Sequence, residues 1–272
     1  MDDITRKDLE RRLKRGDSLR EINMTGLNLD DFNFEGAAFN KCKFSGSSIN
    51  RSNFAFSRFE ACLLNDCEMQ ECNFQESSFV ECDFSKTDLR DSVLIEVNFR
   101  QTVLHSADFS GSFLQDVVFI EARGDLINFS FSNLNSSNFS GAKFHVCDFS
   151  ACHGLGITAT ASDFTGSDFR GARLDTSQLQ GAILNFCNFS EASLQECDLS
   201  KARLFSATLE NALLNSAILD EVLLMGAKAG GAELTDTVLN NANLTKADFS
   251  NSIFDGASMV GVMDQDTVFD GA

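Results

Sequence analysis

One stretch of the chain decides its fold. Residues 161–204 read ASDFT GSDFR GARLD TSQLQ GAILN FCNFS EASLQ ECDLS KARL when they are divided into fives. Every fifth residue is Leu or Phe, and Ala, Ser or Cys stands two positions before it. A period of five fits neither the 3.6-residue turn of a helix nor the two-residue alternation of a strand. The stretch therefore predicts a repeat architecture rather than a series of ordinary helices and strands.

The five-residue register extends from Leu19 to Phe269 without an insertion or deletion. Of its 51 central positions, 21 are Phe, 21 are Leu, three are Met and one is Ile. Ala, Ser, Cys or Thr fills 41 of the 50 positions that lie two residues before a centre, counted from Ile22. We expect both positions to face an apolar interior. Five centres depart from the pattern: Gly124, Gly154, Ala159, Ala229 and Asp264.

A simple geometry accounts for five residues. If the small residue and the centre both point inward, they and the residue between them form a short extended side, and the other two residues turn a corner. Thirteen of the 18 glycines lie two residues after an apolar centre, where a type II turn requires a positive φ. Four such sides close a coil of 20 residues. Centres 20 apart should then stack in columns, such as Phe39, Phe59, Phe79, Phe99, Phe119 and Phe139, or Phe109, Phe129, Phe149, Phe169 and Phe189.

These patterns, which appear as A-D-F-S-x, A-N-L-T-x and A-R-L-x-x, resemble those of the pentapeptide-repeat proteins and cover about nine-tenths of the chain. The resemblance implies an all-β fold, a right-handed quadrilateral β-helix of about twelve coils. It is specific for fold and far less specific for function. Two centres in a row are missing in the run ACHGLGITATAS (151–162), so that coil should collapse, bulge or use Leu155 and Ile157 as substitutes.

A helix is predicted at the amino terminus, over residues 1–16, and the β-helix over residues 17–272. Thr5 is the expected N-cap with Asp8 three residues on, Ile4 and Leu9 form a hydrophobic staple, and Gly16 ends the helix. Because it adjoins the first repeat directly, we expect this helix to cover the first coil.

Charge and composition limit the functions to consider. The formal charge is −18, with a net +2 over residues 1–20 and −20 over residues 21–272. Direct binding to nucleic acid is therefore not expected, since that requires clustered Lys and Arg. No segment is typical of a signal peptide or a membrane span, so a cytoplasmic protein is predicted, with translocation by a specialised bacterial secretion system as the alternative.

An enzyme is the class that the sequence favours least. All nine cysteines occupy the small inward position and are interpreted as structural filler in the reduced state. Cys152 and His153 are adjacent in the sequence but point to opposite sides of an extended segment, so they cannot act as a catalytic pair. We expect no catalytic residue, no cofactor and no metal site.

Three surfaces are candidates for binding a protein partner. Carboxylates at outward positions 20 residues apart predict an acidic column of Glu68, Asp88, Asp108, Asp148 and Asp168, with Arg90 and Arg170 beside it. A single coil carries more outward apolar residues than a solvated surface needs, namely Leu213, Ile218, Leu223 and Met225. The last coil predicts a two-fold homodimer at the carboxyl end through Val260, Val262, Met263, Val268 and Phe269.

Three functional interpretations remain open. The first is a rod-shaped, acidic scaffold that binds proteins and has no enzymatic activity. The second is a DNA mimic that regulates a type II topoisomerase such as gyrase, by resemblance to the quinolone-resistance branch of the family. The third is a bacterial secretion-associated adaptor or effector, because residues 13–37 faintly resemble the start of repeat modules in such proteins.

Overall fold

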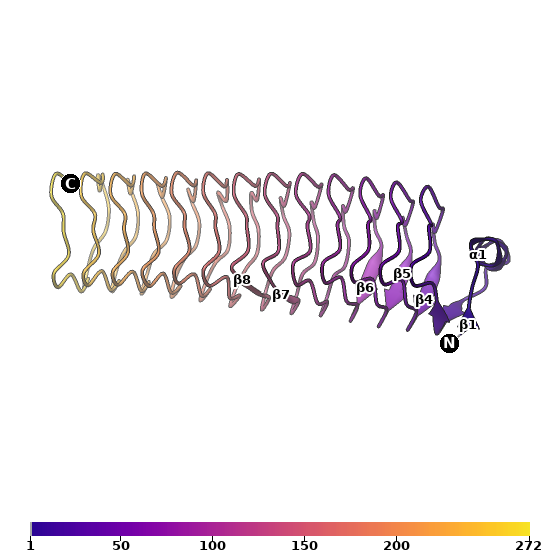
Figure 1. The fold of residues 1–272 in the computed structure, drawn as a ribbon. Coiled ribbons are helices and arrows are strands. Elements are labelled where there is room, and N and C mark those ends of the chain that lie inside the picture. The colour runs from indigo at the N-terminus through magenta and orange to yellow at the C-terminus, as the bar shows by residue number, and fades with distance from the viewer. Residues whose placement is uncertain (1) are drawn as a thin grey trace. The chain divides into compact units, whose positions relative to one another are not determined.

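A computed structural model describes residues 2–272, which form two compact units. Unit 1 extends to Asn133 and unit 2 comprises Leu134–Ala272. Within each unit the chain winds into a stack of coils (Figure 1). The predicted quadrilateral β-helix is confirmed, because parallel pairing joins residues that are 20 positions apart, as in Leu19 with Phe39 and Phe39 with Phe59.

Regular elements are short because each side of a coil is only three residues long. The helix is α1 (Arg6–Lys14). The strands are β1 (Asp2–Asp3), β2 (Leu19–Arg20), β3 (Ile22–Asn23), β4 (Ala38–Asn40), β5 (Arg58–Glu60), β6 (Ser78–Val80), β7 (Arg123–Asp125) and β8 (Lys143–His145). In unit 1, β2, β4, β5 and β6 form a four-stranded parallel sheet. Most other sides pair with the next coil through a single residue, as Glu68 does with Asp88.

The corners confirm the role predicted for glycine. Every fifth residue from Gly16 to Gly271 has a positive φ, and these positions comprise 15 glycines and 37 other residues in the described chain. The backbone at Gly156 obeys the same rule, with a φ of 65°, although the neighbouring centres are missing. The turn geometry is therefore set by the repeat and is kept even where glycine is absent.

Phenylalanine rings fill the interior in stacked columns, as expected. In unit 1, the ring centroids of Phe39 and Phe59 lie 4.5 Å apart, and those of Phe99 and Phe119 lie 5.3 Å apart with an interplanar angle of 5°. In unit 2, the Phe149, Phe169 and Phe189 rings stack at 4.7 and 4.8 Å. These distances match the spacing between neighbouring strands of a sheet, about 4.8 Å, so each coil brings its ring into contact with the next.

The coil at 151–162 neither collapses nor bulges. Ile157 turns into the core from the position that normally holds a small residue and is only 4% exposed, while Leu155 remains 44% exposed. A Cβ atom at Gly154 would lie 3.4 Å from the Ile157 side chain. The pair thus exchanges roles, because the large side chain comes from the small position and the centre has none. Gly124 and Ile127 do the same in unit 1, where a Cβ at Gly124 would lie 2.9 Å from Ile127.

The small inward positions explain the use of Ser and Cys. Ser47 donates its hydroxyl to the carbonyl oxygen of Met24 at 2.7 Å and accepts the N–H of Leu27 at 3.2 Å, so a hydroxyl here joins consecutive coils. All nine cysteines are buried free thiols, as predicted for this position. Burial raises the pKa of Cys67 and of Cys152 to about 12, which keeps both thiols protonated.

The amino-terminal cap has the predicted helix signals but a different extent. Thr5 is the N-cap and accepts the N–H of Asp8 at 3.2 Å, and Ile4 and Leu9 are buried. The helix begins only at Arg6, because residues 2–3 form β1, which pairs in parallel with β3. Arg6 donates to the carbonyl oxygens of Asn28 at 3.3 Å and of Asp30 at 3.0 Å. The cap thus supplies donors to first-coil carbonyls that have no preceding coil to bind.

Candidate functional site

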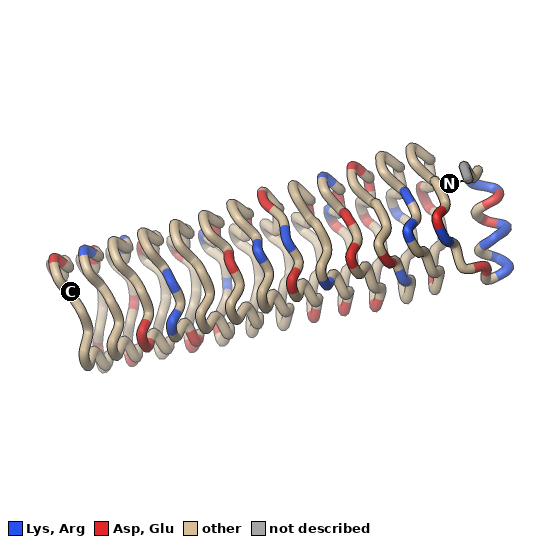
Figure 2. The backbone as a smooth tube through the Cα atoms, turned by 90° about the horizontal axis from the view of Figure 1, so that it is seen from below, with Lys and Arg blue, Asp and Glu red and all other residues tan. Residues whose placement is uncertain are grey.

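The predicted acidic column exists within each unit. Isolated parallel bridges join Glu68 to Asp88 and Asp88 to Asp108 in unit 1, and Asp148 to Asp168 in unit 2. The carboxylates therefore stand in register on successive coils. Figure 2 shows basic residues gathered on α1, while acidic and basic residues are distributed along the coils.

These aspartates also have a structural task that the sequence analysis missed. Asp108 accepts the backbone N–H of Ser110 at 2.9 Å, and Asp148 accepts that of Ser150 at 2.8 Å. Asn128 at an equivalent position accepts the N–H of Ser130 at 3.0 Å in the same way. Asn and Asp both close this turn, so the fold requires the oxygen atom but not the charge.

Part of the charge in the column is neutralised, as the sequence predicted. Arg90 pairs with Asp88 at 2.7 Å, and Arg170 pairs with Asp168 at 2.6 Å. Burial acts to raise the pKa of Asp88, but hydrogen bonds from Arg90 and Gln70 outweigh it, so the pKa lies below its ordinary value. Asp88 is therefore ionised at neutral pH and already has a cationic partner.

The four apolar residues of the coil at 213–225 do not form one patch. Leu213 pairs with Glu233, Ile218 with Val238 and Leu223 with Asn243, which places them on three successive sides of the coil. Met225 is a corner residue that directly follows the side of Leu223 and adjoins neither of the other two. Only Leu223 and Met225 can therefore contact one partner surface together.

Phenylalanines outside the central register mark the surface that sequence reasoning missed. Of the 27 phenylalanines, 21 are centres and six are not. Phe32 is buried beneath the guanidinium of Arg6, whose carbon lies 5.2 Å from the ring centroid. The other five are Phe56, Phe113, Phe131, Phe186 and Phe205, with exposed fractions of 51, 49, 73, 58 and 44%. Their departure from the register is a signal that the sequence already contained.

Two of these rings meet on one face of unit 2. The centroids of Phe186 and Phe205 lie 5.8 Å apart at 79°, an edge-to-face contact. Arg203 is bridged to Ile183 on one neighbouring coil and to Leu223 on the other, and Met225 follows Leu223 by two residues. We call this surface the aromatic face and define it by Ile183, Phe186, Arg203, Phe205, Leu223 and Met225.

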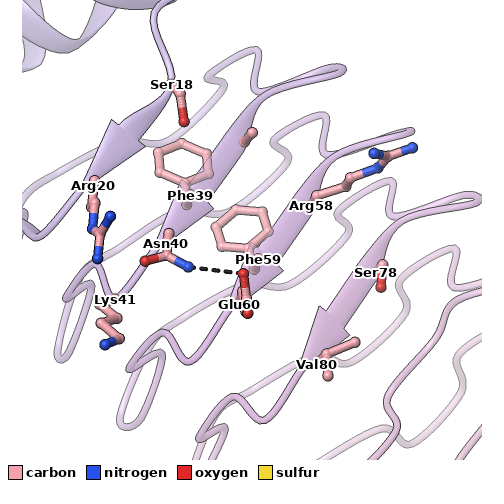
Figure 3. A pocket seen from close by; sticks show the side chains of 11 residues that line it. Ser18, Arg20, Phe39, Asn40, Lys41, Arg58, Phe59, Glu60, Ser78 and Val80 are labelled. Atoms are coloured by element: carbon pink, nitrogen blue, oxygen red, sulfur yellow. Dashed lines mark hydrogen bonds between the residues drawn. The ribbon is translucent and has the colours of Figure 1, made fainter.

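A hollow of about 790 Å³ lies over β2, β4, β5 and β6 in unit 1. Figure 3 shows Arg20 and Lys41 on one side of it and Arg58 on the other. Asn40 donates to Glu60 across its floor at 2.8 Å, and Arg20 pairs with Glu21 at 3.4 Å. Arginine and lysine side chains suit an anionic group, but none of the polar residues described as lining this hollow is buried.

The structure separates the adjacent cysteine and histidine that the sequence analysis considered as a catalytic pair. Cys152 is buried, whereas His153 is exposed on the outer surface, so their side chains point apart as predicted. Across residues 2–272, no three or more His, Cys, Asp or Glu side chains are grouped so as to hold a metal ion. Within the same residues, the helix is too short and too polar to cross a membrane.

The carboxyl-terminal residues predicted to form a dimer are accessible in part. Val260, Met263 and Val268 are 72, 52 and 39% exposed, and Val262 and Phe269 are partly exposed. The Phe269 ring stacks on Phe249 at 5.9 Å.

Comparisons with known proteins agree with the geometry. One family model, described as a pentapeptide repeat region, matches residues 53–129, and a second, described as pentapeptide repeats in eight copies, matches residues 18–54, 175–211 and 223–261. No curated protein sequence matches the chain.

Solved structures of two other proteins align with the chain. HetL, a pentapeptide-repeat protein involved in heterocyst differentiation regulation in the cyanobacterium Nostoc sp. strain PCC 7120, is 19% identical, with 97% of this chain and 94% of HetL aligned and a TM-score of 0.48. A trypsin-treated form of QnrB1, a plasmid-mediated fluoroquinolone resistance protein, is 21% identical over 74% of this chain and 90% of its own, with a TM-score of 0.43.

Proposed function

Because this chain belongs to the pentapeptide-repeat family, we propose that it is a non-enzymatic scaffold that binds other proteins through the outer surface of its coils. The observation that carries the proposal is the set of five exposed phenylalanines outside the central register. Large exposed aromatic side chains are typical of surfaces that bind protein partners.

Three of these phenylalanines destabilise the free protein in two separate ways. Phe56, Phe131 and Phe186 are corner residues with φ values of 60, 58 and 60°. The left-handed conformation costs a residue with a side chain roughly 1–2 kcal/mol, and the exposed ring adds unfavourable contact with water. Glycine or asparagine would avoid both costs at such a corner. Binding to a partner would offset them.

The test replaces the five rings together and keeps the fold. Phe56, Phe131 and Phe186 are changed to Asn, and Phe113 and Phe205 to Ser. Wild type and variant are expressed at equal level in the source cells, cross-linked in the cell, and their cross-linked proteins are quantified by mass spectrometry. We expect unchanged circular dichroism and a loss of most specific partners. Recovery of the same partners in the same amounts would refute the scaffold function through this surface.

A second candidate, the DNA mimic, is favoured by one observation. The carboxylates of Glu68, Asp88 and Asp108 lie in register on successive coils, like charges along a nucleic-acid strand. On this hypothesis the protein inhibits or protects gyrase in a supercoiling assay. Changing Asp88, Asp108, Asp148 and Asp168 to Asn removes four charges and retains the oxygen that closes each turn. The effect on gyrase should then be lost.

A matched control removes the same charge elsewhere. Glu71, Glu121, Glu191 and Glu221 are corner residues outside the column, and their change to Gln should leave the effect on gyrase intact. An unaltered supercoiling rate with wild-type protein would eliminate the DNA mimic.

The two-fold dimer at the carboxyl end is a further proposal. Residues 247–272 contain five aspartates and no Lys or Arg, so a symmetric contact brings like charges together. Salt screens such repulsion, and sedimentation equilibrium should show a dimer that tightens as NaCl is raised. A monomer at every salt concentration would rule this dimer out.

A further inference from the structure

We propose that the aromatic face of unit 2 docks a segment of a partner protein that carries apolar side chains beside a carboxylate. The inference rests on the proposed scaffold function and names the site and the chemistry of the partner. Its centre is the edge-to-face pair of Phe186 and Phe205.

The backbone holds the two rings in place before any partner arrives. Phe186 donates its N–H to the carbonyl oxygen of Phe205 at 2.9 Å. Phe205 in turn donates its own N–H to the side-chain oxygen of Asn185 at 3.0 Å. Because these bonds fix the backbone of both residues and the two rings contact each other, less conformational entropy is lost when a partner covers them.

Other apolar side chains extend the surface on both sides of the rings. Leu223 is 36% exposed and Met225 is partly exposed on the next coil, where Ser206 donates its N–H to the Met225 carbonyl oxygen. Val146, 57% exposed, occupies the equivalent corner two coils before Phe186. Gly166 stands between them, and a Cβ there would lie only 3.6 Å from Val146. Gly166 therefore places no side chain between Val146 and Phe186.

The composition is that of an interface rather than of a solvated surface. Protein interfaces are enriched in aromatic residues, Met and Arg and depleted in Lys, Glu and Asp. The six residues of the aromatic face include two Phe, one Met and one Arg, and none is acidic, although the whole chain carries a charge of −18.

The one charged residue of the aromatic face, Arg203, indicates the chemistry of the partner segment. Arg203 is exposed, and within the described residues no carboxylate lies within ion-pair distance of it. Asp163, the acidic residue in the same outward column, accepts from Thr165 and lies 3.4 Å from His145. A guanidinium without a partner favours a carboxylate in bidentate geometry, so the docking segment carries Asp or Glu next to its apolar anchors.

Selection of peptides on the whole protein tests the proposal. A phage library of random dodecapeptides is selected on the immobilised wild-type protein, and the enriched sequence is synthesised. We expect Phe, Leu or Ile together with one Asp or Glu. Its affinity should fall more than tenfold with the Phe186→Asn/Phe205→Ser variant, and about tenfold with Arg203→Glu. Asn is chosen at position 186 because it tolerates the left-handed corner.

Phe131→Asn is the matched control, because it removes an exposed corner ring of unit 1 without touching the aromatic face. Peptide affinity should not change in this variant. The proposal is overturned if no consensus is enriched, if the consensus lacks a carboxylate, or if the substitutions in unit 2 leave binding unchanged. It is also overturned if sedimentation shows that wild-type protein self-associates through these rings. Each result differs from failure of the scaffold function, which the cross-linking experiment measures independently.

Discussion

The interior of unit 1 and the outer surface of unit 2 use the same side chain for opposite purposes. Phe99 is fully buried, with its ring stacked on Phe79 at 5.5 Å and on Phe119 at 5.3 Å. Phe186 is 58% exposed and touches a second exposed ring. The two residues differ only in their place within the five-residue repeat. The comparison teaches that position in the register, rather than residue type, decides whether a ring stabilises the fold or is available to a partner.

The largest expected effect comes from breaking the interior column. Phe99→Ala should lower the free energy of unfolding by about 3–5 kcal/mol, because coils tied by backbone hydrogen bonds cannot close the cavity. Phe131→Ala should change it by no more than about 0.5 kcal/mol. Urea denaturation followed by circular dichroism measures both. Equal losses would show that register does not separate the two classes of ring.

The next prediction concerns Gly154 and Ile157 in unit 2, where the large inward side chain comes from the small position and the centre has no side chain. Ile157→Ala should cost about 2–5 kcal/mol, because the side chain fills space that Gly154 leaves empty. Leu155→Ala, at an exposed position, serves as the control and should cost far less. Adding Gly154→Leu to Ile157→Ala restores the usual arrangement of a small residue before a large centre, and should recover much of the loss. A double variant no more stable than Ile157→Ala would contradict the exchange.

Acid should weaken the fold by protonating the aspartates that accept backbone N–H groups at the turns, such as Asp88. The pKa of Asp88 is lowered in the folded protein from its ordinary 3.8. A lowered pKa adds stability at neutral pH that is lost as pH falls from about 4 through the folded value. Asp88→Asn keeps the turn oxygen but should reduce this acid-dependent loss, by about 1 kcal/mol or less for a partly exposed pair. Denaturation curves between pH 7 and about pH 3 give the comparison, and identical slopes for both proteins would be the contrary result.

The smallest expected effect lies at the corners. Phe131→Gly should stabilise unit 1 by about 0.5 kcal/mol. Glycine relieves the strain of the left-handed conformation, but it also raises the conformational entropy of the unfolded chain, which cancels part of that stabilisation. Phe186→Gly should be nearly neutral, since it also removes the contact with Phe205. Thermal melts of the two variants side by side provide the measurement. A clear stabilisation by Phe186→Gly would mean that the ring pair contributes nothing to the free protein.

Most of the core residues could be predicted from the sequence, because the rule that turns a side chain inward acts within a single five-residue repeat. A centre such as Phe59 and the small residue before it point the same way in any extended segment, and a corner such as Gly111 requires a positive φ wherever it lies. The outer surface did not follow so directly. The apolar coil at 213–225 looked like one patch in the sequence, but Leu213 and Ile218 lie on different sides of it.

The sequence alone therefore determined the coil, its 20-residue register, the interior columns and the positions of the turns, since each of these repeats a five-residue rule. Only the tertiary structure decided which outward side chains meet. Phe186 and Phe205 are nineteen residues apart, and they touch because the same corner of two successive coils brings them together. Likewise, Ile157 rather than Leu155 enters the core, because the corner geometry holds at Gly156 and keeps the alternation of inward and outward positions. Contacts between coils depend on how the chain is stacked, and that information is spread over 20 residues rather than five.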